Sequence, residues 1–320
     1  MRIATGGGLI VLAAVLAQSA PAPAQYPLRP IRLVVPFAAG SANDILGRII
    51  GPPLSEALGR PVVIDNRPGA GGNIGAELAA NSPPDGYTLM MGNISHAISV
   101  TLYSKLGYDL VKDFAPVSWL TSGSFLMAVH PSVPARSVRE LIALARARPG
   151  QLNVATSGAG VFLASELFLG MAGVKMTNVT YRSTPQAITA LVSGEGSVGF
   201  PGTSAAVPHV RSAKLRALAV TSVRRSPMAP DVPTIAEAGV PGYEASPWYG
   251  LMVPAKTPSE IISRLHAESV KALERPDVKE RFATTDFQPI GTGPGQFGAH
   301  IRSEIEKWGK IVKATSLRPG

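Results

Sequence analysis

The sequence predicts an α/β fold made of two lobes that are joined by two crossing strands. Short β-rich runs alternate with longer helical patterns, as they do in parallel α/β units. The alternation occurs twice, on either side of a long apolar stretch without helical spacing, Phe114–Pro131. A second stretch of this kind, Tyr243–Ala255, follows the second set. Two lobes connected in this way form a hinge.

The first 24 residues predict a secretory signal peptide ahead of the first lobe. Arg2 precedes an apolar run, Leu9–Ala17, and the small residues Ala22-Pro23-Ala24 then have the form of a signal peptidase site. We expect cleavage after Ala24, before Gln25, and export of the chain. The alternative is a membrane anchor, but the run has only about half of the roughly 20 residues that span a bilayer.

Three strands are predicted in the first lobe, each followed by a loop rich in small residues. Ile31–Val35 is the first, and a helix then runs to about Leu58. Val62–Asp65 is the second, followed by "NRPGAGGNIG" and another helix. Tyr87–Met91 is the third and leads into "GNISHA", which we expect to be a loop.

The second lobe repeats the pattern. Its first helix begins at a capping box, Ser137 to Glu140, and ends at Pro149-Gly150. After this helix we expect, in order, a strand at Leu152–Ala155, a helix to Met171, a strand at Asn178–Tyr181, a helix over Pro185–Val192 and a strand at Ser197–Phe200.

The two apolar stretches set the expected domain boundaries. Because each lacks helical spacing, we expect each to be extended and to cross between the lobes. Lobe I then comprises residues 25–123 and 248–320, and lobe II comprises residues 124–247. The last predicted helices, near Pro258–Leu273 and Pro294–Ala314, fold back onto lobe I.

Composition excludes several classes of function. The chain has 320 residues, 45% of them hydrophobic, which is enough for a sizeable core. It has no cysteine, so we expect no disulfide, thiolate nucleophile or cysteine-based metal site. The net charge of +9 could suggest nucleic acid, but the basic residues are scattered, and the densest cluster is Arg224 and Arg225. We expect a small anion as the partner and no nucleic acid.

Three of the predicted strand-to-helix loops are candidates for anion sites. They are "AAGSAND" and "PGAGGNIG" in lobe I and "TSGAG" in lobe II. The free N–H groups and positive dipole of a helix N-terminus attract anions, and glycine lets a ligand approach the backbone. The alternative is ordinary turn chemistry, for which glycine is also used. Three such loops spread over two lobes favour the anion sites.

No nucleotide-binding or catalytic motif is present. The phosphate-loop signature is absent, and the one G-x-G-x-x-G, Gly194–Gly199, precedes a strand instead of following it. The five histidines have no metal-ligand spacing. We therefore expect no catalytic residue, no metal and no cofactor. His96, which we expect in a loop, is the one histidine to follow, and Asp44 is expected in the first turn of its helix.

The stretches "NRPGAGGNIGAE" and "DVPTIAEAGVPGYE" are highly specific, and similar matches run through nearly the whole chain after residue 24. On these residues the sequence resembles the Bug family, the periplasmic receptors of tripartite tricarboxylate transporters. The resemblance implies a periplasmic-binding-protein-like fold whose two lobes close on a carboxylate held by backbone amides and water. We expect a monomer that delivers its ligand to membrane transporter subunits or to a sensor.

The resemblance also implies where the ligand lies. In lobe I the contacts fall on Phe37, Ala38, Gly40, Ser41, Asn43, Ala70, Gly71, Gly72 and Asn73, with Asn93 and Ser95 nearby. In lobe II they fall on Thr156, Ser157, Gly158, Tyr181 and Arg182.

Lobe II departs from the family pattern in a way that bears on specificity. Phe162 stands where the family has a histidine, and Pro201 stands where it often has an aspartate. This half of the site is therefore more apolar. We hypothesise a ligand with one carboxylate held by lobe I and an apolar or aromatic remainder facing Phe162 and Pro201.

A secreted enzyme acting on small carboxylates is the alternative function. It would use Ser95 or His96, because catalysis needs an acid or base within hydrogen-bond reach of the substrate. The cleft offers few such groups, so a binding protein is the preferred reading. A purely structural role would leave the glycine loops of both lobes unexplained.

Overall fold

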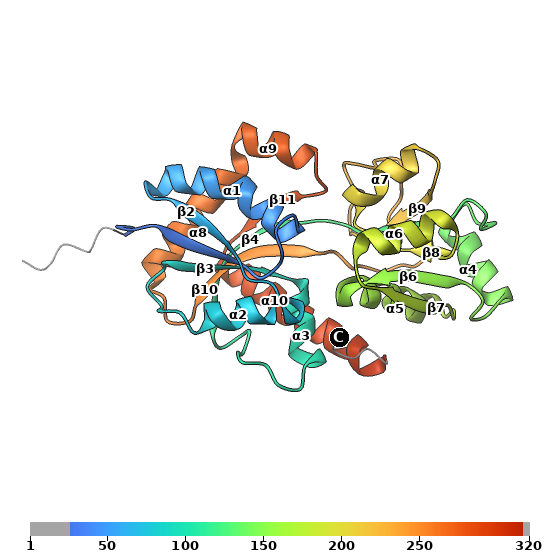
Figure 1. Cartoon of the computed structure of the whole chain (residues 1–320), viewed down its shortest axis with the longest axis horizontal. Coiled ribbons are helices and arrows are strands. Elements are labelled where there is room, and N and C mark those ends of the chain that lie inside the picture. The colour runs from blue at the N-terminus through green and yellow to red at the C-terminus, as the bar shows by residue number, and fades with distance from the viewer. Residues whose placement is uncertain (1–25, 316–320) are drawn as a thin grey trace, which may run out of the picture.

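The computed structural model describes residues 26–315 and has two α/β lobes side by side (Figure 1). The predicted fold class is therefore confirmed. The predicted signal peptide, residues 1–24, lies outside the described residues. Within residues 26–315, no helix is long and apolar enough to cross a membrane.

The first sheet has six strands in the order β11-β4-β10-β3-β1-β2. Their bounds are β1 (Ile31–Val35), β2 (Val62–Asn66), β3 (Thr88–Asn93), β4 (Phe114–Ser122), β10 (Trp248–Pro254) and β11 (Gln288–Thr292). β1 pairs in parallel with β2 and with β3, whereas β10 runs antiparallel to β3 and β4. The carboxyl ends of β1, β2 and β3 therefore lie at the same edge of the sheet.

Helices cover both faces of this sheet because its strands alternate their side chains between two cores. Leu33 and Val35 pack with Leu46 of α1, whereas Val34 packs with Ala76 of α2. The helices on the Leu33 side are α1 (Ala42–Leu58), α8 (Ser259–Glu274) and α9 (Pro276–Ala283). Those on the Val34 side are α2 (Asn73–Ala80), α3 (Ile94–Leu102) and α10 (Pro294–Ala314).

The second sheet has five strands in the order β7-β6-β8-β5-β9. Its strands are β5 (Leu126–Val129), β6 (Asn153–Ser157), β7 (Thr177–Tyr181), β8 (Val198–Gly199) and β9 (Arg216–Val220). Its helices are α4 (Val138–Ala147), α5 (Gly158–Ala172), α6 (Thr184–Ser193) and α7 (Thr203–Arg211). One continuous core joins the α3 and α10 side of the first lobe to α4 and α5 of the second.

The chain passes between the sheets at two adjacent places. β4 ends at Ser122 and β5 begins at Leu126, while β10 begins at Trp248, directly opposite Ser122 in the first sheet. Both crossing segments are extended, as predicted. The strands of the first sheet all come from residues 25–123 and 248–320, and those of the second sheet all come from residues 124–247. We therefore keep this division as the proposed domain boundary.

Several elements differ from the sequence prediction. "GNISHA" is not a loop, because Asn93 caps helix α3 and its side-chain oxygen accepts from the Ser95 N–H (3.0 Å). His96 therefore lies in a helix. The box at Ser137 is also altered, since the Glu140 carboxylate accepts from the Arg136 N–H (2.7 Å) and not from Ser137. The elements α7, α9, β9 and β11 were not predicted.

We predict that Gly75→Ala destabilises lobe I. An added Cβ would lie 2.8 Å from the carbonyl oxygen of Arg67 and 2.8 Å from Cα of Pro36, both backbone atoms that cannot rotate away. Overpacking of this kind costs about 1–3 kcal/mol, which thermal denaturation would detect. Gly170→Ala is the control, because nothing lies within 4 Å of its added Cβ, and it should stabilise helix α5 by about 0.5–1 kcal/mol. Equal melting temperatures for the two variants would contradict the packing of α2 against β1.

Candidate functional site

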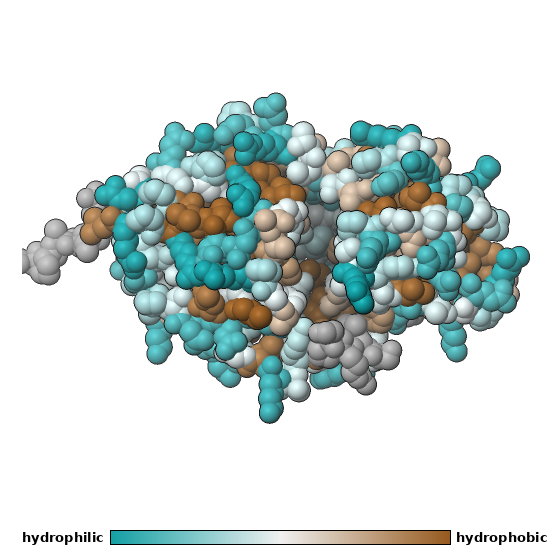
Figure 2. All heavy atoms as spheres, viewed as in Figure 1, coloured by the Kyte–Doolittle hydropathy of each residue, from teal (hydrophilic) through white to brown (hydrophobic). Residues whose placement is uncertain are grey.

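Three loops of lobe I meet where β1, β2 and β3 end, on the side that faces lobe II. Each leads into the N-terminus of a helix, as predicted for β1 and β2. The tips of the first two loops are exposed at Ala38, Gly40, Ala70 and Gly71. In the space-filling view the surface is hollowed between the two lobes (Figure 2).

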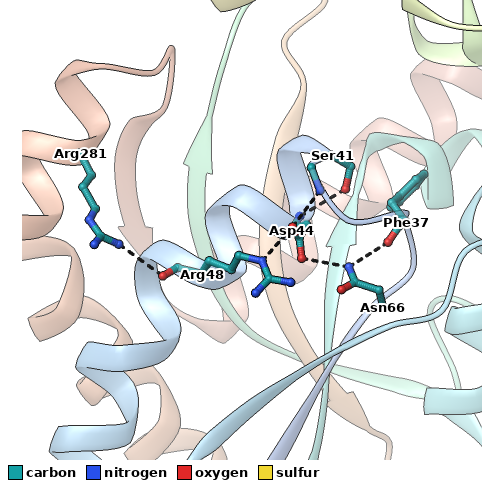
Figure 3. A network of polar contacts seen from close by, with 7 residues as sticks. Phe37, Ser41, Asp44, Arg48, Asn66 and Arg281 are labelled. Carbon is teal, nitrogen blue, oxygen red and sulfur yellow. Dashed lines mark hydrogen bonds and ion pairs between the residues drawn. The ribbon is translucent and has the colours of Figure 1, made fainter.

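A buried carboxylate holds the first loop, residues 36–41. Asp44 accepts from the Gly40 N–H (2.9 Å), from Arg48 Nε (2.9 Å) and from Asn66 Nδ2 (3.0 Å), which also donates to the carbonyl of Phe37 (Figure 3). The Arg48 hydrogen bond is the main cause that lowers the pKa of Asp44 to about 2. The charge at this helix start therefore fixes the backbone of the loop.

Two asparagines connect the first and third loops. Asn93 Nδ2 donates to Asn43 Oδ1 (2.9 Å), and Asn43 Nδ2 donates to the carbonyl of Met91 (3.2 Å). Both side chains are buried. The family resemblance implied both residues as ligand contacts, which stays a prediction, and the structure shows that their amides hold the starts of α1 and α3 together.

The second loop has an unusual backbone. Gly69, Ala70, Gly71 and Gly72 have consecutive positive φ angles of 134°, 47°, 67° and 101°. An added Cβ on Gly72 would lie 2.9 Å from Phe37 Cζ and 3.2 Å from His96 Nε2. Position 72 needs both a positive φ and the absence of a Cβ, and only glycine provides both. Its backbone therefore packs directly against Phe37 and His96.

Two buried donors beside Gly72 have no hydrogen-bond partner among the described residues, Asn73 Nδ2 and His96 Nε2. Asn73 Oδ1 accepts from the Tyr108 hydroxyl (2.8 Å), which leaves the amide N–H groups for another partner. His96 Nδ1 lies 3.1 Å from the Asn93 nitrogen and 3.3 Å from the Asn93 carbonyl oxygen. We assign the shorter contact as the hydrogen bond, with Nδ1 as acceptor, and Nε2 then carries the hydrogen of the neutral ring. Burial lowers the pKa of His96 to about 4, so the ring is neutral at pH 7. Buried donors without partners are uncommon and indicate a place for an acceptor.

In lobe II the loop after β6 approaches this region. An added Cβ on Gly160 would lie 3.8 Å from Ile94 Cγ2, so the start of α5 faces the start of α3. Gly158 has φ 72°, and Ser157 precedes α5 with its hydroxyl 3.1 Å from that of Thr184. Thr156 is fully buried, and its hydroxyl donates to the carbonyl of Val179 (3.3 Å). The Thr156 hydroxyl is therefore bonded to the neighbouring strand β7.

The other residues predicted in lobe II lie in different surroundings. Tyr181 and Arg182 line a groove of about 580 Å³ along β7 and α6, where the Tyr181 hydroxyl donates to Glu195 (3.0 Å). Pro201 is buried beside Ser157, and Phe162 is half-buried on α5. Contact of any of them with a ligand stays a prediction.

The site has little that could do acid–base chemistry. Ser95 is half-buried on α3, next to a histidine whose Nδ1 is already bonded to backbone. No group of three or more His, Asp or Glu side chains in residues 26–315 could hold a metal ion.

We predict that Asp44→Asn removes part of the acid sensitivity of the fold. The folded pKa of Asp44, about 2, lies below the ordinary value of 3.8, so its stabilisation is complete above about pH 4 and is lost as the pH falls toward 2. The variant should lose about 2 kcal/mol at pH 7 and show a flatter decline between pH 4 and 2 in urea unfolding. Asp231→Asn, at an exposed acid, is the control. A decline as steep as that of the wild type would contradict the role of this carboxylate.

Comparison with known proteins shows the family. The family model described as the tripartite tricarboxylate transporter family receptor matches residues 46–317. Protein BugT of Bordetella pertussis is 35% identical over 297 residues, which are 92% of this chain and 91% of BugT. A UPF0065 protein from the tcbD-tcbE intergenic region of Pseudomonas sp. strain P51 is 36% identical over 290 residues, which are 90% of this chain and 86% of that protein.

Solved structures agree. "R. palustris Rpa4515 with adipate" has a TM-score of 0.79 and 37% identity, over 90% of this chain and 97% of that one. "MatC (Rpa3494) from Rhodopseudomonas palustris with bound malate" has a TM-score of 0.75 and 33% identity, and the match covers 90% of this chain and 100% of that one. The resemblance of the sequence to the Bug proteins is thereby confirmed, and the chain belongs to the receptor family of the tripartite tricarboxylate transporters.

Proposed function

We propose that this protein captures a small carboxylate between its lobes in the periplasm and delivers it to a tripartite tricarboxylate-type transporter or to a sensor. The observation that carries the proposal is the buried donor Asn73 Nδ2 at the start of α2, which has no hydrogen-bond partner among the described residues. Adipate and malate, named in two related structures, are both carboxylates and support the same ligand class.

The carboxylate would be held mainly by N–H groups of the backbone. The loop before α2 is exposed at Ala70 and Gly71, and a helix N-terminus adds the positive end of its dipole. The N–H of Gly40 already donates to Asp44, so in the loop before α1 it serves to hold the backbone. The proposed lobe I contacts are Phe37, Ala38, Gly40, Ser41, Asn43, Ala70, Gly71, Gly72, Asn73, Asn93 and Ser95. Those proposed in lobe II are Thr156, Ser157, Gly158, Phe162, Tyr181, Arg182 and Pro201.

Binding would close the hinge, because a ligand that touches both lobes has a higher affinity for the closed form. Lobe II offers the start of α5 for this contact, which lies against the start of α3 at Gly160. The apolar Phe162 and Pro201 favour a monocarboxylate with an apolar or aromatic remainder.

A catalytic role has less support. A general base needs a pKa near the working pH, whereas His96 is neutral and buried, with its pKa lowered to about 4. Asp44 accepts three hydrogen bonds and is not free to accept a proton near neutral pH. We infer that the protein binds its ligand without transforming it.

We predict that carboxylates stabilise the purified protein in a thermal-shift screen of mono-, di- and tricarboxylates, aromatic acids and amino acids. A ligand at a hundred times its dissociation constant adds about 2.7 kcal/mol to the free energy of unfolding. Monocarboxylates with an apolar or aromatic remainder should shift the melting temperature most. Tight binding of citrate or an amino acid in preference to aromatic acids would overturn the specificity. If no carboxylate shifts the melting temperature and mass spectrometry finds no endogenous ligand, the proposed function is wrong.

We predict that Asn73→Asp weakens binding of the best ligand from that screen at least about 100-fold. The substitution keeps the acceptor for Tyr108 but replaces the unpartnered N–H donor by a carboxylate oxygen, which repels an anion. Isothermal titration calorimetry measures the loss. The control is Asn81→Asp, the same change at the exposed C-terminal end of the same helix. Wild-type affinity in a folded Asn73→Asp protein would remove this residue from the site.

A further inference from the structure

A second pocket between the lobes lies behind the hinge, with a volume of about 760 Å³. Trp119 of β4, Gln288 of β11 and His300 of α10 line it from lobe I, and Arg224 and Glu244 line it from lobe II. In the sheet order, β4 and β10 separate β11 from the three strands that carry the candidate carboxylate site. The two sites are therefore on opposite sides of the crossing strands.

One wall of this rear pocket is a pair of stacked rings. The indole of Trp119 and the imidazole of His300 have centroids 3.7 Å apart and planes inclined by 12°. Trp248 meets His300 edge-on, with centroids 5.6 Å apart. Trp119 and His300 are only half-buried, so part of each ring is available to a ligand. A flat ring is the partner that such a surface favours.

Two polar atoms of the rear pocket have no partner. Gln288 Nε2 and His300 Nε2 are buried and make no hydrogen bond to the described residues. Burial lowers the pKa of His300 to about 4, so at pH 7 the ring is neutral and carries one N–H. An occupant with hydrogen-bond acceptors would satisfy Gln288, which can only donate through Nε2.

The charges of the rear pocket leave one cation free. Lys307 Nζ lies 2.6 Å from Glu244 and 2.5 Å from Glu304, so it neutralises both acids in part. The second carboxylate oxygen of Glu304 accepts from the indole N–H groups of Trp248 (3.1 Å) and Trp308 (2.8 Å). Arg224 is exposed and forms no ion pair with any residue in 26–315. This guanidinium is available to an anion.

We propose that the rear pocket is a second binding site, for a small aromatic or heteroaromatic carboxylate. The ring of the ligand packs against Trp119 and His300, an acceptor atom meets Gln288 Nε2, and its carboxylate pairs with Arg224. Binding here uses none of the residues of the carboxylate site in front of the hinge.

Tryptophan fluorescence tests this proposal directly. The chain has three tryptophans, and all surround the rear pocket, since Trp119 lines it and Trp248 and Trp308 both bind Glu304. The probes are benzoate and nicotinate, with the acyclic adipate as the comparison. We expect a saturable change in emission with at least one of the two ring acids.

Matched variants separate the two sites. Arg224→Gln and Gln288→Leu should each weaken ring-acid binding at least about 10-fold, whereas Arg225→Gln, whose arginine pairs with Glu237 (3.0 Å), should leave it unchanged. These measurements are made in the Asn73→Asp background, because the site in front of the hinge is itself proposed to take aromatic monocarboxylates. Arg224 is exposed, so its loss does not threaten folding. The proposal is overturned if no ring acid binds in the Asn73→Asp background, or if Arg224→Gln and Arg225→Gln behave alike there.

Discussion

A buried carboxylate, Asp286, ties the two lobes together beside the hydrophobic core that they share. It lies between α9 and β11 in lobe I, where it accepts from the N–H and hydroxyl of Ser124 and from the hydroxyl of Ser226. Ser124 belongs to the first crossing segment, and its hydroxyl lies 2.6 Å from that of Thr203 at the start of α7. Burial raises the pKa of Asp286, and the hydrogen bonds act in the opposite direction by stabilising the charged form. The carboxylate thus ties the last part of lobe I to the crossing segment and to lobe II.

Polar side chains around the candidate carboxylate site also hold backbone in place. Asp44 is bonded to Gly40, Arg48 and Asn66, and the amides of Asn43 and Asn93 are bonded to each other. Each of these contacts satisfies a buried polar group and at the same time fixes a loop whose tip is exposed. A site built in this way presents backbone N–H groups in fixed positions and needs few charged groups of its own. That arrangement suits an anion that must later be released.

Local sequence signals predicted much of the fold but less of the site. The apolar strands such as Ile31–Val35 and the cap at Ser137 depend on neighbours in sequence, so pattern analysis found them. The helix that carries His96 was missed, although Asn93 stands at its N-cap, because its small polar start resembles a turn. The unpartnered state of Asn73 and His96 depends on Tyr108, Gly72 and other distant groups, which no local pattern contains. The rear pocket was missed for the same reason, since β11 and α10 meet lobe II only in the folded chain.

Two sites on opposite sides of one hinge cannot be independent if the hinge moves. The crossing segments next to β4 and β10 act as the axis, so a rotation that narrows the space on the β3 side widens the space on the β11 side. A ligand in front of the hinge and a ligand behind it would then each favour the hinge angle that fits it best. Linkage requires each to alter the affinity of the other by the same factor. Because Arg224 and Glu244 approach the rear pocket from lobe II, while Trp119 and His300 approach it from lobe I, its shape depends on the angle between the lobes. Occupation of the rear pocket would therefore oppose or assist closure according to which angle gives its ligand the better fit.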